Sequence, residues 1–399
     1  MDEQGSEPSE SMRSWKRLDG IDLLRGLAIF FVLMNHVNMR LLAAKVPYTE
    51  GLPQQFVHSL IWNGEFGVQI FFAISGFLIT STALRRWGEP SKVRVRDFYV
   101  LRFARIAPLL LALLAVLSVL HATHVHNFVV SAKTGGLGQA LFAALTLHVN
   151  FLEARRGYLP GSWDILWSLS VEEMFYLFFP LACRLLGRGK LLAVALCAFA
   201  VVGPFARTTL AHGNPVLQEY SYLGGMDAIA LGCLTALFLA RQRLGRRVLW
   251  TVGSTGGVLM IFILCFSIRA NQWGLGRSGL SMSILAIGTC MVIAAFAQSQ
   301  WRSPGLMAPL RLMGQRSYEV YLTHMFVVFG LSAVFVELGK PIKAVPVLFG
   351  LIIVVSGLVG EVVARFYSEP MNRWLRNRFG DGPDRLGWAI RGSELKPLV

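Results

Sequence analysis

Long apolar runs fill most of this chain, and each run is long enough to cross a membrane. A transmembrane helix needs about 20 mostly apolar residues. Only 15% of the 399 residues are charged, whereas a soluble domain carries about 25%. The sequence therefore predicts an all-α polytopic membrane protein of about ten transmembrane helices. The predicted spans are residues 21–42, 66–84, 106–122, 165–184, 191–210, 223–240, 248–268, 277–298, 316–336 and 345–366.

Basic residues gather in alternate loops, which predicts the orientation of the chain. Cytoplasmic loops of membrane proteins collect Lys and Arg, and the loop Arg85–Arg105 alone holds seven basic residues. Placing both termini in the cytoplasm puts most of the 38 basic residues on that side. The formal net charge of +15 is then explained by topology. The chain carries no nucleic-acid recognition motif, so nucleic acid is not an expected partner.

One apolar segment, residues 138–152, is too short for a span and is predicted to be a re-entrant or interfacial helix on the external side. A model with eleven spans stays open. Residues 1–17 are polar and are expected to form a disordered cytoplasmic tail. A transmembrane domain should follow over residues 18–371, with a cytoplasmic C-terminal tail over residues 372–399.

Arg25 and His36 lie in the first predicted span, where charged or titratable side chains are costly and mark candidate functional sites. Their spacing of about three helical turns puts them on one face, roughly 16 Å apart along the axis. A guanidinium suits phosphate, and a histidine suits general-base work near neutral pH. An anionic cofactor held at Arg25 could therefore extend a long arm to His36. Alternatively, Arg25 pairs with Asp22, and His36 bonds to a neighbour.

The span over residues 165–184 contains two adjacent acids, Glu172 and Glu173. Counting residues along each helix places Glu172 and His36 at similar depth below the external surface. We therefore expect Glu172 to orient the His36 imidazole. Tyr176 should share a face with Glu172 because it lies one turn away. The alternative is a carboxylate that pairs with an arginine to lock two helices together.

Further polar residues lie at the ends of spans or within them. Asp227 could cap a helix at its external end or line a cavity, and Tyr321 and His324 could be site residues or interfacial anchors. Arg102 and Arg105 lie where the basic loop meets the third span, and they could be ordinary cytoplasmic charge or a phosphate clamp for a nucleotide-like cofactor. No metal site is expected, because the five cysteines show no metal-binding spacing. Motifs of serine hydrolases, NTPases, zincins and dinucleotide-binding proteins are also missing from the sequence.

An ordered set of segments resembles the acyltransferase 3 family of bacterial membrane proteins, from about residue 18 to residue 371. The first span carries an arginine, ten residues and a histidine, and the other motifs follow in the family's order. The segments are RLDGIDLLRGLAIFFVLMNH, FGVQIFFAISGFLIT, RFARIAP, WSLSVEEMFYLFFP, MDAIALG and SYEVYLTH, with a late Glu369-Pro370.

The resemblance implies a ten-helix core in a bacterial inner membrane that transfers an acyl group across the bilayer from acyl-CoA. Acetyl-CoA is the expected co-substrate, with no permanently bound cofactor, and the acceptor is expected to be a sugar or glycan hydroxyl. The family's arginine and histidine fall on Arg25 and His36, its basic pair on Arg102 and Arg105, and its glutamate on Glu172. A fused extracellular SGNH domain, which some members carry, is not expected, because the chain ends shortly after its last predicted span.

These observations lead to a mechanistic hypothesis. Arg102 and Arg105, with Arg25, grip the phosphates of acyl-CoA, and His36 either deprotonates the acceptor hydroxyl or carries the acyl group itself. Tyr176, Asp227, Tyr321, His324 and Glu173 are weaker candidates for the substrate cavity. The rival hypotheses are a small-molecule transporter and a non-catalytic scaffold or sensor.

Overall fold

The computed structural model describes residues 18–299 and 301–380, and every regular element there is helical. A long helix covers each of the ten predicted spans. These helices are α1 (Asp19–Ala43), α3 (Gly64–Trp87), α4 (Val95–Ala122), α8 (Leu166–Leu186), α9 (Leu191–Arg207), α11 (Tyr222–Arg241), α12 (Arg246–Cys265), α14 (Leu280–Ser299), α16 (Ser317–Glu337) and α17 (Val345–Val363). Within the described ranges, nine helices are long and apolar enough to cross a membrane. Helix α9, with 17 residues, is the shortest of the ten.

The predicted short segment consists of two helices. Helix α5 (Gly136–Leu145) has 10 residues and α6 (Val149–Arg156) has 8 residues. At 1.5 Å per residue neither reaches the roughly 30 Å of a bilayer core. The structure thus agrees with a short non-spanning element and disfavours an eleventh span.

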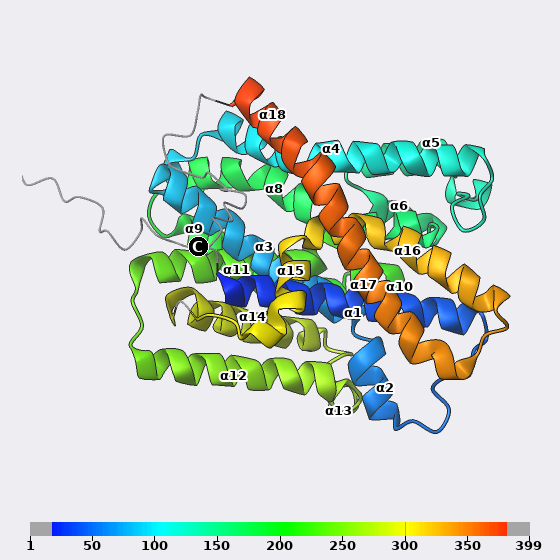
Figure 1. Ribbon diagram of the computed structural model, residues 1–399. Coiled ribbons are helices and arrows are strands. Elements are labelled where there is room, and N and C mark those ends of the chain that lie inside the picture. Colours follow the sequence, from blue (N-terminus) through cyan, green and yellow to red (C-terminus); the bar gives the residue numbers. More distant parts are fainter. Residues whose placement is uncertain (1–17, 300, 381–399) are drawn as a thin grey trace, which may run out of the picture.

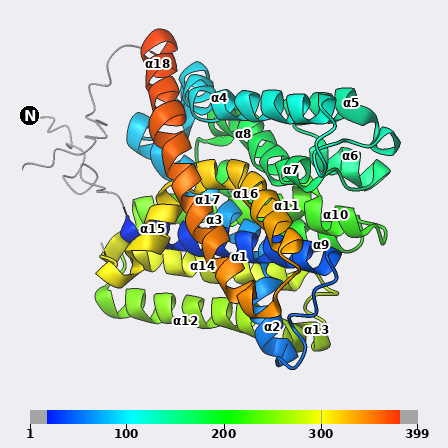
Figure 2. The ribbon, with the colours of Figure 1, turned by 45° about the vertical axis from the view of Figure 1, so that its right-hand side comes forward.

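The C-terminal part of the described chain remains helical beyond the predicted end of the domain. Helix α17 passes through a π-helical turn at Ala364–Ser368 into α18 (Glu369–Phe379), and Figure 2 shows them as one long, tilted element. The segment predicted to be a disordered tail, residues 1–17, lies outside the described residues.

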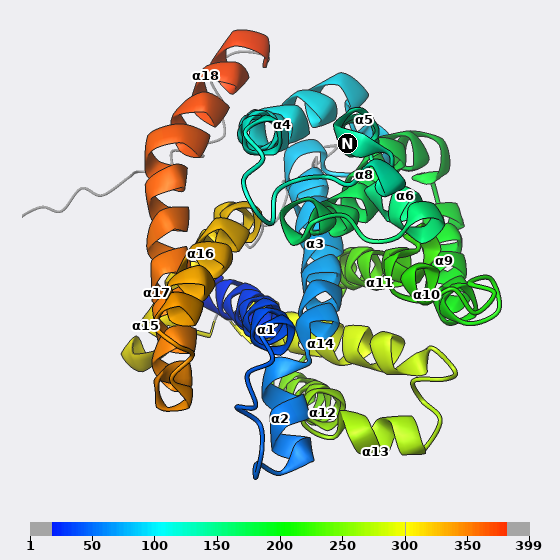
Figure 3. The ribbon, with the colours of Figure 1, turned by 90° about the vertical axis from the view of Figure 1, so that its right-hand side faces the viewer.

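Helices α1 and α3 occupy the middle of the bundle, with α16 and α17 on one side and α9 and α11 on the other (Figure 3). Helices α3 and α11 pack closely because small residues face each other. A Cβ atom at Gly76 would lie 1.9 Å from the Ile229 carbonyl oxygen, and one at Gly232 would lie 2.0 Å from that of Ala73. Gly76 therefore allows close helix packing, as small residues within a span usually do.

Short helices gather at the end of the bundle that the loop charges predict to be external. They are α2 (Gln54–Ile61), α6, α10 (Pro215–Tyr220) and α13 (Ser267–Gln272), at the right-hand end in Figure 1. Helix α7 (Gly161–Asp164) leads from this end into α8. At the opposite end, α15 (Ala308–Gln315) packs against α1.

Candidate functional site

His36 of α1 and His324 of α16 form a pair inside the bundle. Their ring centroids lie 4.9 Å apart, and His324 Nε2 lies 3.4 Å from His36 Nδ1. His324 is completely buried, whereas His36 is partly exposed. The pair joins two helices that are far apart in the sequence, because 288 positions separate the two histidines.

Backbone carbonyls determine which nitrogen of each ring carries the proton. His36 Nδ1 lies 2.8 Å from the Val32 carbonyl oxygen, and His324 Nδ1 lies 2.6 Å from that of Tyr321. A carbonyl oxygen can only accept a hydrogen bond, so both Nδ1 atoms carry hydrogen. The lone pair of His324 Nε2 then faces the N–H of His36. This leaves His36 Nε2 as an unprotonated nitrogen that can act as a base or nucleophile.

The expected contact between Glu172 and His36 is wrong. Glu172 Oε1 accepts a hydrogen bond from Ser75 and another from Tyr176, the latter at 2.7 Å. Among the described hydrogen bonds and ion pairs, none joins Glu172 to His36. His324 therefore occupies the orienting position that the sequence analysis gave to Glu172. The predicted shared face of Glu172 and Tyr176 is confirmed.

Arg102 and Arg105 of α4 are held by acidic partners. Arg102 lies 2.8 Å from Glu173 and 3.8 Å from Glu172, with its guanidinium 3.8 Å from the centre of the Tyr176 ring. Arg105 lies 3.2 Å from Glu319 of α16, which is 1% exposed. Glu173 thus links α8 to α4, which matches the alternative of a carboxylate that pairs with an arginine to lock two helices together.

Arg25 of α1 lies within electrostatic reach of the same cluster. The charges that act on its guanidinium come from Asp22, Arg105, Glu319 and Glu172. The structure therefore brings together the three arginines that the sequence singled out as phosphate-binding candidates. Arg25 lies toward the predicted cytoplasmic end of α1, about three helical turns from His36.

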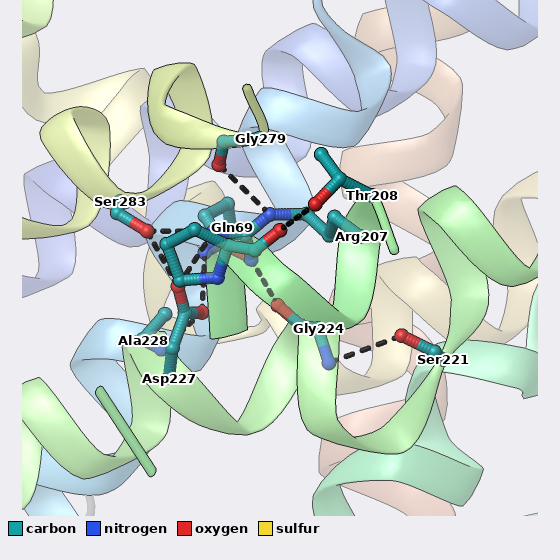
Figure 4. A network of polar contacts seen from close by, with 10 residues as sticks. Gln69, Arg207, Thr208, Ser221, Gly224, Asp227, Ala228, Gly279 and Ser283 are labelled. Carbon is teal, nitrogen blue, oxygen red and sulfur yellow. Dashed lines mark hydrogen bonds and ion pairs between the residues drawn. The ribbon is translucent and has the colours of Figure 1, made fainter. Parts of the chain in front are cut away.

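Asp227 is buried in a polar network rather than open to a cavity (Figure 4). Its carboxylate accepts a hydrogen bond from Arg207 at 2.7 Å, from Ser283 at 2.7 Å and from Gln69 at 3.0 Å. Arg207 also donates to the carbonyl oxygens of Gly224 and Gly279. The network ties α3, α9, α11 and α14 together. Helix α11 is capped instead by Ser221, whose hydroxyl accepts from the Gly224 N–H.

Tyr321 connects the histidine pair to α8. Its hydroxyl lies 2.6 Å from Ser168 Oγ and donates to the Ile165 carbonyl oxygen at 3.0 Å. Its ring lies 5.8 Å from that of His324. Ser168 and Arg207 are not among the predicted site residues, because a serine within a span or an arginine at its end is common in membrane helices. No group of three possible metal ligands occurs in the part of the chain that the structure describes.

Comparison with known proteins supports the resemblance. Residues 18–365 match the family described as an acyltransferase domain. The chain is 23% identical to O-acetyltransferase OatA of Staphylococcus aureus, over 98% of this chain and 63% of that protein. It is 24% identical to peptidoglycan O-acetyltransferase OatA of Listeria monocytogenes, over 90% of this chain and 56% of that protein.

The chain spans less than two thirds of the length of these curated relatives. No solved structure matches it significantly. The family match nevertheless covers nearly all of the described residues and includes both members of the histidine pair. This chain therefore belongs to the acyltransferase 3 family and is a multi-pass membrane protein.

Proposed function

We propose that the chain is a membrane O-acyltransferase that moves an acyl group, with acetyl as the first choice, from acyl-CoA to a sugar or glycan hydroxyl. Family membership and the names of the two OatA relatives support this class of reaction. The observation that carries the proposal is the 2.8 Å contact of His36 Nδ1 with the Val32 carbonyl oxygen, because a hydrogen on Nδ1 leaves Nε2 unprotonated, with His324 3.4 Å from Nδ1. The protein acts in a bacterial inner membrane.

The donor binds at the predicted cytoplasmic end, where Arg25, Arg102 and Arg105 contact its phosphates. A guanidinium offers several N–H donors in a plane, so it can contact two phosphate oxygens at once. The carboxylates of Glu173 and Glu319 fix the directions of Arg102 and Arg105. The pantetheine arm then follows α1 toward His36 and places the thioester beside Nε2.

In direct transfer, His36 Nε2 removes the proton of the acceptor hydroxyl while the oxygen attacks the thioester carbonyl carbon. The carbon–sulfur bond breaks as the tetrahedral intermediate collapses, and the CoA thiolate takes the proton back from Nε2. The Val32 carbonyl holds the Nδ1 hydrogen of His36, and the lone pair of His324 Nε2 beside it shares that hydrogen and stabilises the imidazolium, as an orienting group does for a catalytic histidine.

In the covalent route, the lone pair of His36 Nε2 attacks the thioester carbonyl carbon and the carbon–sulfur bond breaks. CoA leaves as the thiolate, which takes a proton from solvent, and the acyl-imidazolium keeps its Nδ1 hydrogen. The acyl group then passes to the acceptor oxygen, the hydroxyl proton goes to Nε2, and solvent removes it from there. This route divides one difficult step into two. A labelled protein that can be trapped only when His36 is intact would favour it.

The test compares His36→Ala with His126→Ala in membranes supplied with radiolabelled acetyl-CoA. His126 is exposed in a loop and serves as the matched control. We expect acetylation of endogenous glycan or added sugar to be lost in His36→Ala and retained in His126→Ala. Acetylation at the wild-type rate in His36→Ala contradicts the proposal. A sugar flux through proteoliposomes that needs no CoA and is unchanged by His36→Ala would instead support the transporter hypothesis.

A further inference from the structure

Arg40 lies near the end of α1, four residues beyond His36 and therefore on the same helix face. One helical turn separates the two residues, which is about 6 Å along the helix axis. The charge of Arg40 acts on the His36 imidazole. The loop charges predict that this end of α1 is external, and external segments of membrane proteins carry few basic residues. Topology therefore does not explain an arginine at this position.

Two side chains hold the Arg40 guanidinium in place. Its Nη1 donates to Asn127 Oδ1 in the loop after α4, at 3.4 Å, and its central carbon lies 4.7 Å from the centre of the Phe329 ring. Phe329 follows His324 by five residues in α16, and its ring meets that of Phe128 edge-on at 5.2 Å. Helix α16 and the loop after α4 thus fix the guanidinium on the predicted external side of the histidine pair.

Arg40 lacks the carboxylate partner that other arginines of the bundle have. Ion pairs with carboxylates occur at Arg102, Arg105, Arg207, Arg311 and Arg316. Arg40 forms none among the described residues, and no carboxylate there acts on its charge. Its Nε is buried and has no hydrogen-bond acceptor in the described part of the chain. Because a buried donor without an acceptor and a buried cation without a counter-charge are both costly, the structure positions this guanidinium without neutralising it.

A carboxylate or a phosphate would supply what this guanidinium lacks. Arginine presents five N–H donors in one plane, and two of them can bind two oxygen atoms of the same anion. At Arg40 only Nη1 has a hydrogen-bond partner among the described residues, and the side chain is partly exposed. The separation of one helical turn from His36 is comparable with the width of a single sugar ring. An anion at Arg40 and a hydroxyl at His36 can therefore belong to one sugar.

We propose that Arg40 binds an anionic group of the acceptor, a carboxylate or a phosphate, and so selects sugars that carry this group close to the reacting hydroxyl. The anion contacts the Arg40 guanidinium while the hydroxyl lies at His36 Nε2. Asn127 and Phe329 are positioning residues, because they act through the guanidinium that they hold. The inference rests on the proposed function, because it names the class of acceptor for that reaction.

The test measures sugar binding without acetyl-CoA, by saturation-transfer NMR on the full chain in phosphatidylcholine nanodiscs at pH 7. Methyl β-D-glucuronide and methyl β-D-glucoside are the probes, since they share a ring and differ in one carboxylate. We expect the glucuronide to bind about tenfold or more tightly than the glucoside, because hydrogen bonds between charged groups are the stronger ones. Equal binding of the two sugars, tighter binding of the glucoside, or no binding of the glucuronide overturns the proposal.

Arg40→Gln removes the charge and should lower the affinity for the glucuronide to that for the glucoside. Arg40→Lys keeps the charge without the planar fork and should retain part of the preference. Arg155→Gln is the matched control and should keep the wild-type preference, because Arg155 is an exposed arginine of α6 that lies 4.3 Å from the Phe151 ring. Thermal unfolding shows whether each variant is folded. A folded Arg40→Gln protein that still prefers the glucuronide contradicts the proposal.

The phosphate of a lipid headgroup shares the chemistry of the proposed anion, and a second set of nanodiscs distinguishes the two sources. We expect glucuronide binding to persist when phosphatidylglycerol replaces part of the phosphatidylcholine. Displacement of the glucuronide by this lipid would identify a headgroup site at Arg40 and overturn the proposal. Binding needs no acyl transfer, so a chain that binds the glucuronide through Arg40 but acetylates no sugar would overturn the proposed function alone.

Discussion

Replacing His324 by Phe should reduce turnover while leaving donor binding almost unchanged. The substitution keeps a ring in the buried position but removes the acceptor nitrogen that lies 3.4 Å from His36 Nδ1. That nitrogen matters most when His36 is protonated, and a hydrogen bond to a charged group contributes about 1.5–3 kcal/mol. At 1.4 kcal/mol for each factor of ten, we expect kcat to fall about ten- to a hundredfold.

The assay is steady-state acetyl transfer by purified protein in nanodiscs, with kcat and the KM for acetyl-CoA measured separately. His324→Asn provides the matched comparison, because its side-chain oxygen can still accept a hydrogen bond, and it should retain more activity than His324→Phe. Thermal unfolding of each variant checks that the bundle is intact. A folded His324→Phe protein with the wild-type kcat would refute the role of this pair.

Three further predictions concern stability, the donor and pH. Arg207→Leu removes one partner of the buried Arg207–Asp227 pair and should destabilise the protein by about 3–5 kcal/mol, as measured by unfolding in detergent. The double variant Arg207→Leu/Asp227→Leu should lose less stability, because it leaves no unpaired buried charge. Arg102→Lys should raise the KM for acetyl-CoA about tenfold or more, because lysine cannot reproduce the planar guanidinium contacts; an unchanged KM would count against phosphate binding there. Because burial and the neighbouring Asp164 raise the pKa of Glu153, its carboxyl group stays protonated in the folded protein at a pH where it is ionised in the unfolded chain. The free energy of unfolding should therefore fall as the pH rises from about 5 to 9. Glu153→Gln should reduce the dependence of stability on pH, as measured by thermal unfolding at several pH values. The same pH dependence in the variant and the wild type would contradict a raised pKa of Glu153.

The spans were predictable because the length and apolarity of a helix are local properties of the sequence. The break at Thr146–His148 between α5 and α6 was not visible, since the apolar pattern continues across it. Loop charge predicts the orientation of the bundle, and that orientation remains a prediction.

The site was only partly predictable, because spacing within one helix is local and contact between helices is not. The shared face of Tyr176 and Glu172 was predictable from their spacing of one helical turn, and a hydrogen bond joins the two side chains there. Depth counting placed Glu172 beside His36, but the tilt and rotation of α8 depend on packing against other helices. Those contacts turn Glu172 toward Ser75 and leave His324 next to His36.

The environment of Asp227 also depends on contacts between helices, which the sequence does not reveal. Its sequence position, near the start of α11, suggested an exposed cap or a cavity residue. Its partner Arg207 lies at the end of α9 and resembles ordinary charge at the end of a span. Only the packing of α9 on α11 brings the two into a buried ion pair, with 7% and 0% of their side chains exposed.

In the proposed reaction, the donor is used at the Arg25 end of the bundle and the acceptor at the His36 end. Proteoliposomes with acetyl-CoA sealed inside and a sugar acceptor outside test this claim directly, because CoA does not cross the bilayer. Proteolysis of an N-terminal tag from outside gives the fraction of protein in each orientation. We expect acetylation of the external sugar only by protein whose N-terminus faces the lumen. Equal acetylation when donor and acceptor are both confined to the external side of that protein would contradict it.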